Sequence, residues 1–141
     1  YKKQCDAYFW NAHRHEARGI GGLFFDYCKA TDIMSMEDWF NFVTGVGNSF
    51  LEAYVPIVEK RKNLPYTEAQ KTWQEIRRGR YVEFNLVHDK GTLFGLKTNG
   101  RIESILMSLP PHAQWVYDHH PETGSEEEKL IKILENPIDW I

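Results

Sequence analysis

Residues 81–107 read YVEFNLVHDKGTLFGLKTNGRIESILM. Apolar and polar side chains alternate over residues 81–86, which is the period-two pattern of a β-strand with one buried face. Asp89-Lys90-Gly91 is typical of a turn, and Asn99-Gly100 is a strong signal for a type I′ hairpin turn because both of its positions favour positive φ. The stretch therefore predicts a three-stranded antiparallel meander over about residues 80–107.

Three capping boxes mark helix starts outside this stretch. Ser35, Thr67 and Ser125 are each followed three residues later by an acidic or amide side chain. Apolar residues after Ser35 recur every three or four positions, which predicts a core-packing helix that Pro56 kinks or ends. An earlier strand is expected over residues 20–25. Helices that flank a mostly antiparallel sheet define an α+β fold.

The composition is that of one globular domain. The 141 residues include 42% hydrophobic and 14% aromatic side chains, which is too many for a disordered chain. Lysine plus arginine count 17 against 20 for aspartate plus glutamate, and the net charge of −3 argues against binding to nucleic acid. The longest uncharged stretch, Ser104–Tyr117, is shorter than the roughly 18–20 apolar residues that span a membrane, so we expect no membrane span.

Cys5 and Cys28 form neither a CxxC motif nor a disulfide framework. That usage is typical of a protein from a reducing compartment. The chain starts with Tyr1, and its first ten residues show neither the apolar run of a signal peptide nor the composition of a transit peptide. We expect a cytoplasmic protein, with the mitochondrion as the alternative, and we expect the chain to be a fragment of a longer product.

The densest group of chemically active side chains is HRHEARGIGG, residues 13–22. On a helix, Arg14 and Arg18 would share one face, and such like charges destabilise a helix by roughly 0.2–0.5 kcal/mol unless an anion lies between them. The spacing favours a carboxylate or phosphate ligand, and the alternative is that Glu16 pairs with these arginines at an exposed helix end. His13 is interpreted as a proton-handling or hydrogen-bonding group.

A metal site is an alternative interpretation of the same histidines. In an extended segment, His13 and His15 would bind a metal together with Glu16 or with the pair His119-His120. The sequence contains no HExxH motif. We therefore expect no metal site built from this chain alone.

Two further basic groups stand out. Arg77-Arg78-Gly79-Arg80 lies where the helix after Thr67 is expected to end, and the helix dipole favours positive side chains there. Arg101 directly follows Asn99-Gly100, where the end of a hairpin would present a guanidinium suited to a bidentate carboxylate. The alternative for Arg101 is an unpaired arginine at the rim of the protein.

Three stretches together resemble the oxygen-dependent coproporphyrinogen III oxidase family. They are HRHEARGIGGLFFD (13–26), RRGRYVEFNLVHDKGTLFGLKTNGRIESILMSLPP (77–111) and the closing DW (139–140), and AYVPIVEKRK (53–62) extends the resemblance over essentially the whole chain. The chain departs from the family's usual pattern at four positions, Gln4, Trp10, Asn11 and Asn99. The first three are interpreted as packing changes, whereas Asn99 lies in the turn that would meet the substrate.

The resemblance implies an enzyme of haem biosynthesis. Such an enzyme uses molecular oxygen to decarboxylate two propionates of coproporphyrinogen III to vinyl groups, which gives protoporphyrinogen IX. No organic cofactor is implied, and a divalent metal has been proposed for bacterial members but is not generally required. The resemblance also implies a homodimer and a large antiparallel sheet with helices on both faces. Residues 1–141 would form the C-terminal part of this single domain, and so an incomplete α/β/α sandwich.

The resemblance also implies roles for individual residues. His13 corresponds to a histidine important for catalysis, Asn99, Gly100 and Arg101 to the substrate-binding turn, and residues 81–116 to the dimerisation segment. Together with Arg14 and Arg18, Arg101 would serve a substrate that carries several carboxylates. The family's catalytic aspartate lies upstream of anything present here, so we expect these residues alone to be inactive. A non-catalytic anion-binding module of the same fold is the alternative.

Overall fold

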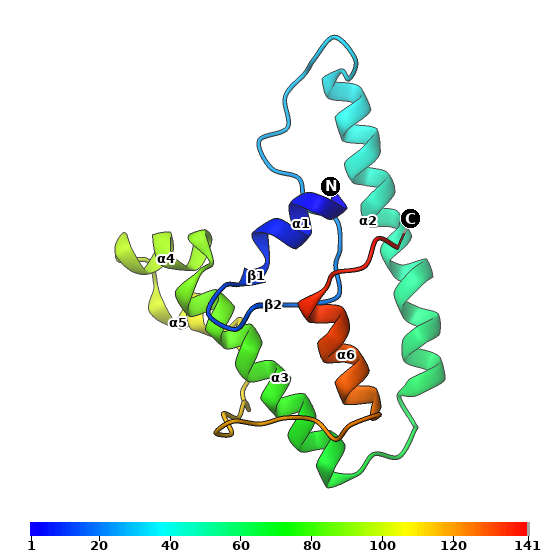
Figure 1. Cartoon of the computed structure of the whole chain (residues 1–141). Coiled ribbons are helices and arrows are strands. Elements are labelled where there is room, and N and C mark those ends of the chain that lie inside the picture. The colour runs from blue at the N-terminus through cyan, green and yellow to red at the C-terminus, as the bar shows by residue number, and fades with distance from the viewer. Residues whose placement is uncertain (141) are drawn as a thin grey trace. The chain divides into compact units, whose positions relative to one another are not determined.

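The structure is a computed structural model that describes residues 1–140, and the chain divides into two compact units. Unit 2 is Phe25–Tyr66 and holds one helix, α2 (Met36–Arg61). Unit 1 joins Tyr1–Phe24 to Thr67–Ile141 (Figure 1). Its elements are α1 (Lys2–Tyr8), β1 (Trp10–Asn11), β2 (Glu16–Ala17), α3 (Glu68–Val87), α4 (Lys90–Lys97), α5 (Ile102–Leu106) and α6 (Glu126–Glu135).

Helix α3 organises unit 1. Strand β1 and helix α4 contact α3, whereas α6 contacts β2 and α5 contacts α4 (Figure 1). Two α3 side chains, Ile76 and Phe84, are only 2% and 1% exposed and form the centre of the core. Cys5 of α1, Ala17 of β2 and Leu134 of α6 are buried as well. The short hairpin β1–β2 is therefore held by helices on both of its strands.

An aromatic group joins α1 to α3. The ring of Tyr8 stacks on Phe24 at a centroid distance of 4.6 Å, and Phe9 lies 5.3 Å from Phe84. Phe9 also meets Phe24 edge to face at 5.3 Å. Ring pairs at these distances each add about 0.5–1.5 kcal/mol beyond the burial of their surface. This group fixes the start of the hairpin, because Phe9 immediately precedes β1.

The helix starts expected from the capping boxes are confirmed. Ser35 and Thr67 each accept a hydrogen bond from the backbone N–H of the third residue of their helix, and the side chain of that residue accepts one from the backbone N–H of the cap. Ser125 accepts from the backbone N–H of Glu128, and the carboxylate of Glu128 accepts from Gly124. Each cap satisfies backbone donors that the first turn of a helix would otherwise leave unpaired.

Helix α2 differs from the expectation in two respects. It continues through Pro56 to Arg61, so the expected end at Pro56 does not occur. A core-packing role is also not seen, because none of the α2 side chains that the structure describes is buried. Phe40, Phe50 and Tyr54 are among its exposed aromatic side chains, although Phe50 and Tyr54 stack on each other at 5.2 Å.

The meander expected over residues 80–107 is wrong. These residues form the end of α3, all of α4 and all of α5. The buried residues of α3 are Ile76, Gly79 and Phe84, whose spacing follows the helical period. The helix that begins after Thr67 continues through residues 81–86, because the apolar–polar alternation there is too short to form a strand instead. Asp89 caps α4 by accepting from the Thr92 N–H rather than forming a hairpin turn.

Asn99 adopts the left-handed conformation expected of it, with φ of 56°, but it ends a helix instead of joining two strands. The N–H of Thr98 donates to the carbonyl of Phe94, and the N–H of Gly100 reaches back to the carbonyl of Gly95 at 2.9 Å. The bond from Gly100 to Gly95 is the 6→1 bond that a Schellman motif uses to end a helix, and here it ends α4. A Cβ at position 100 would lie 2.9 Å from the Gly95 oxygen, so glycine is required there for a steric reason.

The strand expected over residues 20–25 is also absent, and its place is taken by irregular chain in which Gly21 has φ of 126°. Over residues 1–140 the fold is mostly helical, with one two-stranded antiparallel sheet, β1–β2. The helices and the antiparallel pairing agree with the expected class. The part of the chain that the structure describes does not contain an α/β/α sandwich.

Candidate functional site

The hairpin β1–β2 presents the first group of candidate residues. Trp10 pairs with Ala17 and Asn11 with Glu16, so residues 12–15 form the connecting loop. The N–H of Arg14 donates to the Asn11 carbonyl at 3.0 Å, and this bond closes the loop. His13 and Arg14 therefore project from a tight loop. The segment is a hairpin and not a helix, so Arg14 and Arg18 do not share the helical face that the like-charge argument requires.

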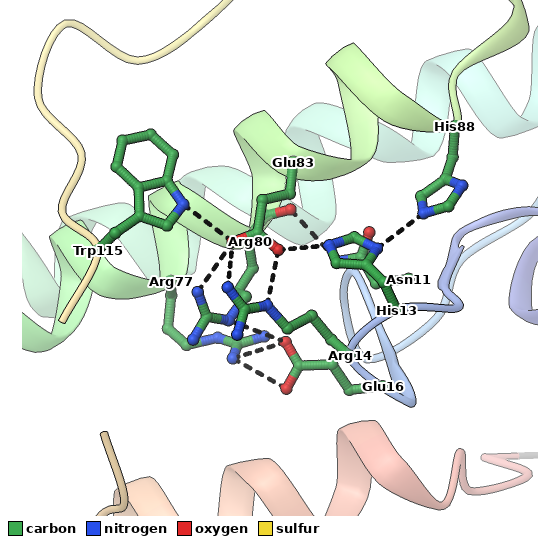
Figure 2. A network of polar contacts seen from close by, with 9 residues as sticks. All are labelled: Asn11, His13, Arg14, Glu16, Arg77, Arg80, Glu83, His88 and Trp115. Carbon is green, nitrogen blue, oxygen red and sulfur yellow. Dashed lines mark hydrogen bonds and ion pairs between the residues drawn. The ribbon is translucent and has the colours of Figure 1, made fainter. Parts of the chain in front are cut away.

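The loop side chains meet the middle of α3 in a polar group that we name the Glu83 cluster (Figure 2). Figure 2 shows the side chains of the hairpin pointing toward those of α3, with a tryptophan from the later chain on the other side. The cluster comprises Asn11, His13, Arg14, Glu16, Arg77, Arg80, Glu83, His88 and Trp115. It brings together residues from distant parts of the sequence.

Glu83 accepts hydrogen bonds from four side chains. Arg14 binds both carboxylate oxygens, Nε to Oε2 at 2.9 Å and Nη2 to Oε1 at 2.8 Å. His13 Nε2 lies 2.7 Å from Oε2. Arg80 Nη1 and Trp115 Nε1 reach Oε1 at 3.0 and 2.9 Å. A carboxylate offers about four lone-pair positions, so these five hydrogen bonds leave no position free.

The same contacts keep Glu83 ionised. Burial of the side chain, which is 11% exposed, acts to raise the pKa of its carboxyl. The hydrogen bonds from Arg14 and His13, the charge of Arg80 and the Trp115 N–H outweigh burial and lower the pKa from 4.5 to about 2. The interaction also raises the pKa of Arg14, mainly through its hydrogen bond to Glu83. Glu83 is therefore a fixed negative charge at neutral pH.

A second ion pair, formed by Glu16, also joins the hairpin to α3. Arg77 Nη1 lies 3.0 Å from Glu16 Oε1, and Arg80 Nε lies 3.7 Å from the same oxygen. Burial lowers the pKa of Arg77, although the charge of Glu16 opposes this effect. Arg77 Nη2 and Asn11 Oδ1 have no hydrogen-bond partner among the described residues. A pocket of about 240 Å³ lies beside this pair and is lined by both arginines and Glu16.

His13 is bound at both ring nitrogens. Its Nε2 contacts Glu83, and its Nδ1 lies 2.9 Å from Nε2 of His88, the residue that caps the C-terminus of α3. The other histidines of the metal alternative do not join this group. His120 pairs with Asp118 at 3.1 Å, and His119 lies against the ring of Trp73 at 5.8 Å. Residues 1–140 contain no group of three side chains placed to hold a metal ion.

Arg18 lies apart from the Glu83 cluster. Its guanidinium sits over Phe9 at 4.2 Å from the ring centroid, with Tyr81 at 5.1 Å and Phe84 at 5.2 Å. Cation–π contacts of this kind contribute about 0.5–2 kcal/mol. Within the described chain, Arg18 forms no ion pair with an acidic side chain. The two arginines of the HRHEARG motif therefore differ: Arg14 is paired with Glu83, whereas Arg18 lies over aromatic rings and has no acidic partner among the described residues.

The turn formed by Asn99, Gly100 and Arg101 lies between α4 and α5. Arg101 occupies the N-cap position of α5 without a side-chain cap bond, and its side chain is exposed. None of the three residues contributes a side-chain hydrogen bond or ion pair to the Glu83 cluster among residues 1–140. The structure thus brings His13 and Arg14 together and leaves Arg18 and Arg101 at separate places.

The family model described as Coproporphyrinogen III oxidase matches residues 1–140. The chain belongs to the coproporphyrinogen III oxidase family. It is 58% identical over 141 residues to a chloroplastic oxygen-dependent coproporphyrinogen-III oxidase of Glycine max, and it covers 36% of that protein. It is 56% identical to an oxygen-dependent coproporphyrinogen-III oxidase of Francisella philomiragia, of which it covers 44%. The chain thus spans less than half the length of these relatives, and the resemblance seen in the sequence is confirmed.

For this member of the coproporphyrinogen III oxidase family, the motifs identified only part of the cluster. The alternation over residues 81–86 predicts a strand with Glu83 on its polar face, and no sequence pattern marks His88 or Trp115 as site residues. A usable signal was present, because Arg77, Arg80 and Glu83 recur every three residues and so share one face of a helix. Nothing in the sequence alone indicates that His88 or Trp115 would meet this face. No helix within residues 1–140 is long and apolar enough to cross a membrane.

Proposed function

We propose that this chain is the C-terminal part of an oxygen-dependent coproporphyrinogen III oxidase domain. The reaction is the oxidative decarboxylation of two propionates of coproporphyrinogen III to vinyl groups in haem biosynthesis, with molecular oxygen as co-substrate and no organic cofactor. The observation that carries the proposal is the family match over residues 1–140, together with relatives of that name at 56–58% identity. In the complete protein, strands from outside this chain would supply the sheet of an α/β/α sandwich.

The arrangement of the arginines supports a substrate with several carboxylates. Arg18 is oriented by three aromatic rings and has no acidic partner in the described chain. Arg101 is exposed at the turn that starts α5, together with Asn99 and Gly100. A guanidinium without a carboxylate of its own binds a propionate through paired charge-assisted hydrogen bonds. We therefore assign propionate binding to Arg18 and Arg101, and we assign the positioning of the hairpin to Arg14.

His13 is the proposed catalytic group of this chain. It lies at the tip of the hairpin, beside α3, where its ring is held by Glu83 and meets His88. A ligand that replaces His88 would gain access to Nδ1 of His13. The base that removes a proton from the reduced tetrapyrrole is proposed to be the family's aspartate, which is supplied by the rest of the protein.

Residues 81–116 are proposed to form a homodimer interface. Within this segment, Phe94, Ile102 and Met107 are 69%, 56% and 80% exposed and supply apolar surface that an interface would cover. The proposed compartment is the cytoplasm, with an organelle as the alternative. The plant relatives carry chloroplastic names, and the Francisella names state no compartment.

The test is turnover by the complete protein. Coproporphyrinogen III is supplied with oxygen, and protoporphyrinogen IX and carbon dioxide are measured. Two molecules of carbon dioxide for each protoporphyrinogen support the oxidase. Tight binding of coproporphyrinogen without turnover would instead support the second candidate, a non-catalytic anion-binding module, which the unpaired Arg18 and Arg101 also fit. Absence of both binding and turnover contradicts both candidates.

A further inference from the structure

We infer that Glu83 is a positioning residue that holds His13 in its Nε2–H tautomer and so makes Nδ1 the hydrogen-bond acceptor of this imidazole. A neutral imidazole has one N–H and one lone pair, and the partner at one nitrogen determines what the other nitrogen can do. The inference deepens the proposed function and rests on it for the chemical use of Nδ1. The tautomer itself follows from the contacts of the cluster.

Glu83 acts only as a hydrogen-bond acceptor in this cluster. Two guanidinium groups and the Trp115 N–H occupy its oxygens in addition to His13, and all of these partners are donors. A carboxylate surrounded in this way has no proton to donate. The contact of 2.7 Å between His13 Nε2 and Glu83 Oε2 is therefore possible as a hydrogen bond only if Nε2 carries the hydrogen.

His88 lies at the other ring nitrogen of His13. With Nε2 of His13 protonated, Nδ1 of the neutral ring holds a lone pair, and the nitrogen 2.9 Å from it must be a donor. Nε2 of His88 then carries a hydrogen as well. The contact with His88 therefore places an N–H donor at Nδ1 of His13. Its ring is held less firmly than that of His13, because its second nitrogen forms no hydrogen bond with the described residues.

Glu83 is held more firmly than His88. Glu83 is anchored by Arg14, Arg80 and Trp115 and is mostly buried. His88 ends α3 at the corner before α4 and is held at the cluster by one hydrogen bond and by ring contacts with His13 and Phe84. Glu83 is therefore the permanent partner of His13, and His88 is the partner that a ligand can replace.

The test reads the tautomer directly in the complete protein labelled with 15N-histidine. Long-range proton–nitrogen correlation spectra at about pH 8 distinguish a protonated from an unprotonated ring nitrogen. Comparison with His13→Gln identifies the His13 signals. We expect a hydrogen on Nε2 and none on Nδ1. A wild-type spectrum with the hydrogen on Nδ1 overturns the inference without the need for any variant of Glu83.

Two matched variants then separate the partners. Glu83→Gln keeps the shape of the side chain, but its amide can donate or accept, so a mixture of both His13 tautomers is expected. His88→Phe keeps a ring beside Phe84 and removes the N–H, and the Nε2–H tautomer should persist. An unchanged tautomer in Glu83→Gln, or a changed one in His88→Phe, would show that Glu83 does not set it.

Activity gives an independent readout. For Glu83→Gln, kcat should fall roughly tenfold or more while KM changes by less than about twofold, because the orientation of a working group is lost rather than a contact with substrate. An equal kcat for wild type and Glu83→Gln contradicts the positioning role. If wild type itself does not convert coproporphyrinogen, the proposed function fails, and the spectra still decide the tautomer.

Discussion

The guanidinium of Arg14 binds the carboxylate of Glu83 through two parallel hydrogen bonds, of 2.9 and 2.8 Å, across 69 positions of sequence. Paired bonds of this kind fix orientation as well as distance. They hold the hairpin loop against α3 at the point where His13 is bound. Glu83 is thus the residue on which both the position of the loop and the charge balance of the cluster depend.

Glu83 should make the free energy of unfolding depend on pH. Its pKa is lowered from 4.5 to about 2 in the folded state, so its contribution is present above pH 4.5 and is lost as the pH falls from about 4.5 to about 2. The shift corresponds to about 3 kcal/mol. The difference in free energy of unfolding between wild type and Glu83→Gln should shrink by about this amount over that window. Glu52→Gln, at an exposed position of α2, is the control.

Gly79 should not tolerate alanine. A Cβ at this position would lie 2.6 Å from the carbonyl oxygen of Gln114, where the chain crosses α3. Because the obstacle is backbone, Gly79→Ala should lower the free energy of unfolding by about 1–3 kcal/mol despite the better helix propensity of alanine. Gly47→Ala in α2 meets no atom within 4 Å and should be neutral or stabilising. Thermal or urea unfolding of both variants checks this, and equal stability of the two would contradict it.

Arg101 should contribute to substrate binding and not to the thermal stability of the protein. It is exposed and has no acidic partner among the described residues. Loss of a charge-assisted hydrogen bond to a propionate is worth about 1.5–3 kcal/mol, so Arg101→Ala should lower kcat/KM roughly 10- to 150-fold with an unchanged Tm. Arg61→Ala, at the exposed end of α2, serves as the control. An Arg101→Ala enzyme with wild-type kcat/KM removes this residue from the site.

Met107 should report on the proposed dimer. Its side chain is 80% exposed, so a charge placed there does not disturb the core of this chain. Buried in an interface, the same charge would be costly, and Met107→Glu should sediment as a monomer. Ile33→Glu, at a position that is 96% exposed in unit 2, is the matched control outside the segment. If Met107→Glu remains a dimer at low protein concentration, Met107 does not lie in the interface.

The sequence predicted those parts of the fold that depend on local chemistry. The caps at Ser35, Thr67 and Ser125 were predictable because each satisfies neighbouring backbone donors. The left-handed conformation of Asn99 was predictable for a similar reason. Whether that conformation joins two strands or ends a helix depends on the segments around it, and there the prediction was wrong. Residues 81–86 carry a period-two pattern that is too short to outweigh the helix that begins at Thr67.

The candidate site was predictable to a similar degree. His13 and Arg14 were singled out because they stand in a dense polar motif. For Glu83 the only signal is its three-residue spacing from Arg80, and neither this spacing nor anything near His88 indicates that the two would meet a loop about 70 positions earlier in the sequence. Arg14 and Arg18 would repel each other only on one face of a helix, and in the structure this segment is a hairpin. In the structure, a carboxylate of this chain neutralises Arg14, which the argument had assigned to an external anion.

The hairpin has consequences for the order of folding. Its strands contain two residues each, which is too few for a hairpin to persist in water on its own. The bonds that place its loop join residues 69 to 75 positions apart, so they cannot form until α3 exists and the intervening chain has closed. We expect the loop to dock after the main barrier, with φ-values near zero for Arg14 and Glu83. Substitutions here should then hasten unfolding and leave the refolding rate nearly unchanged.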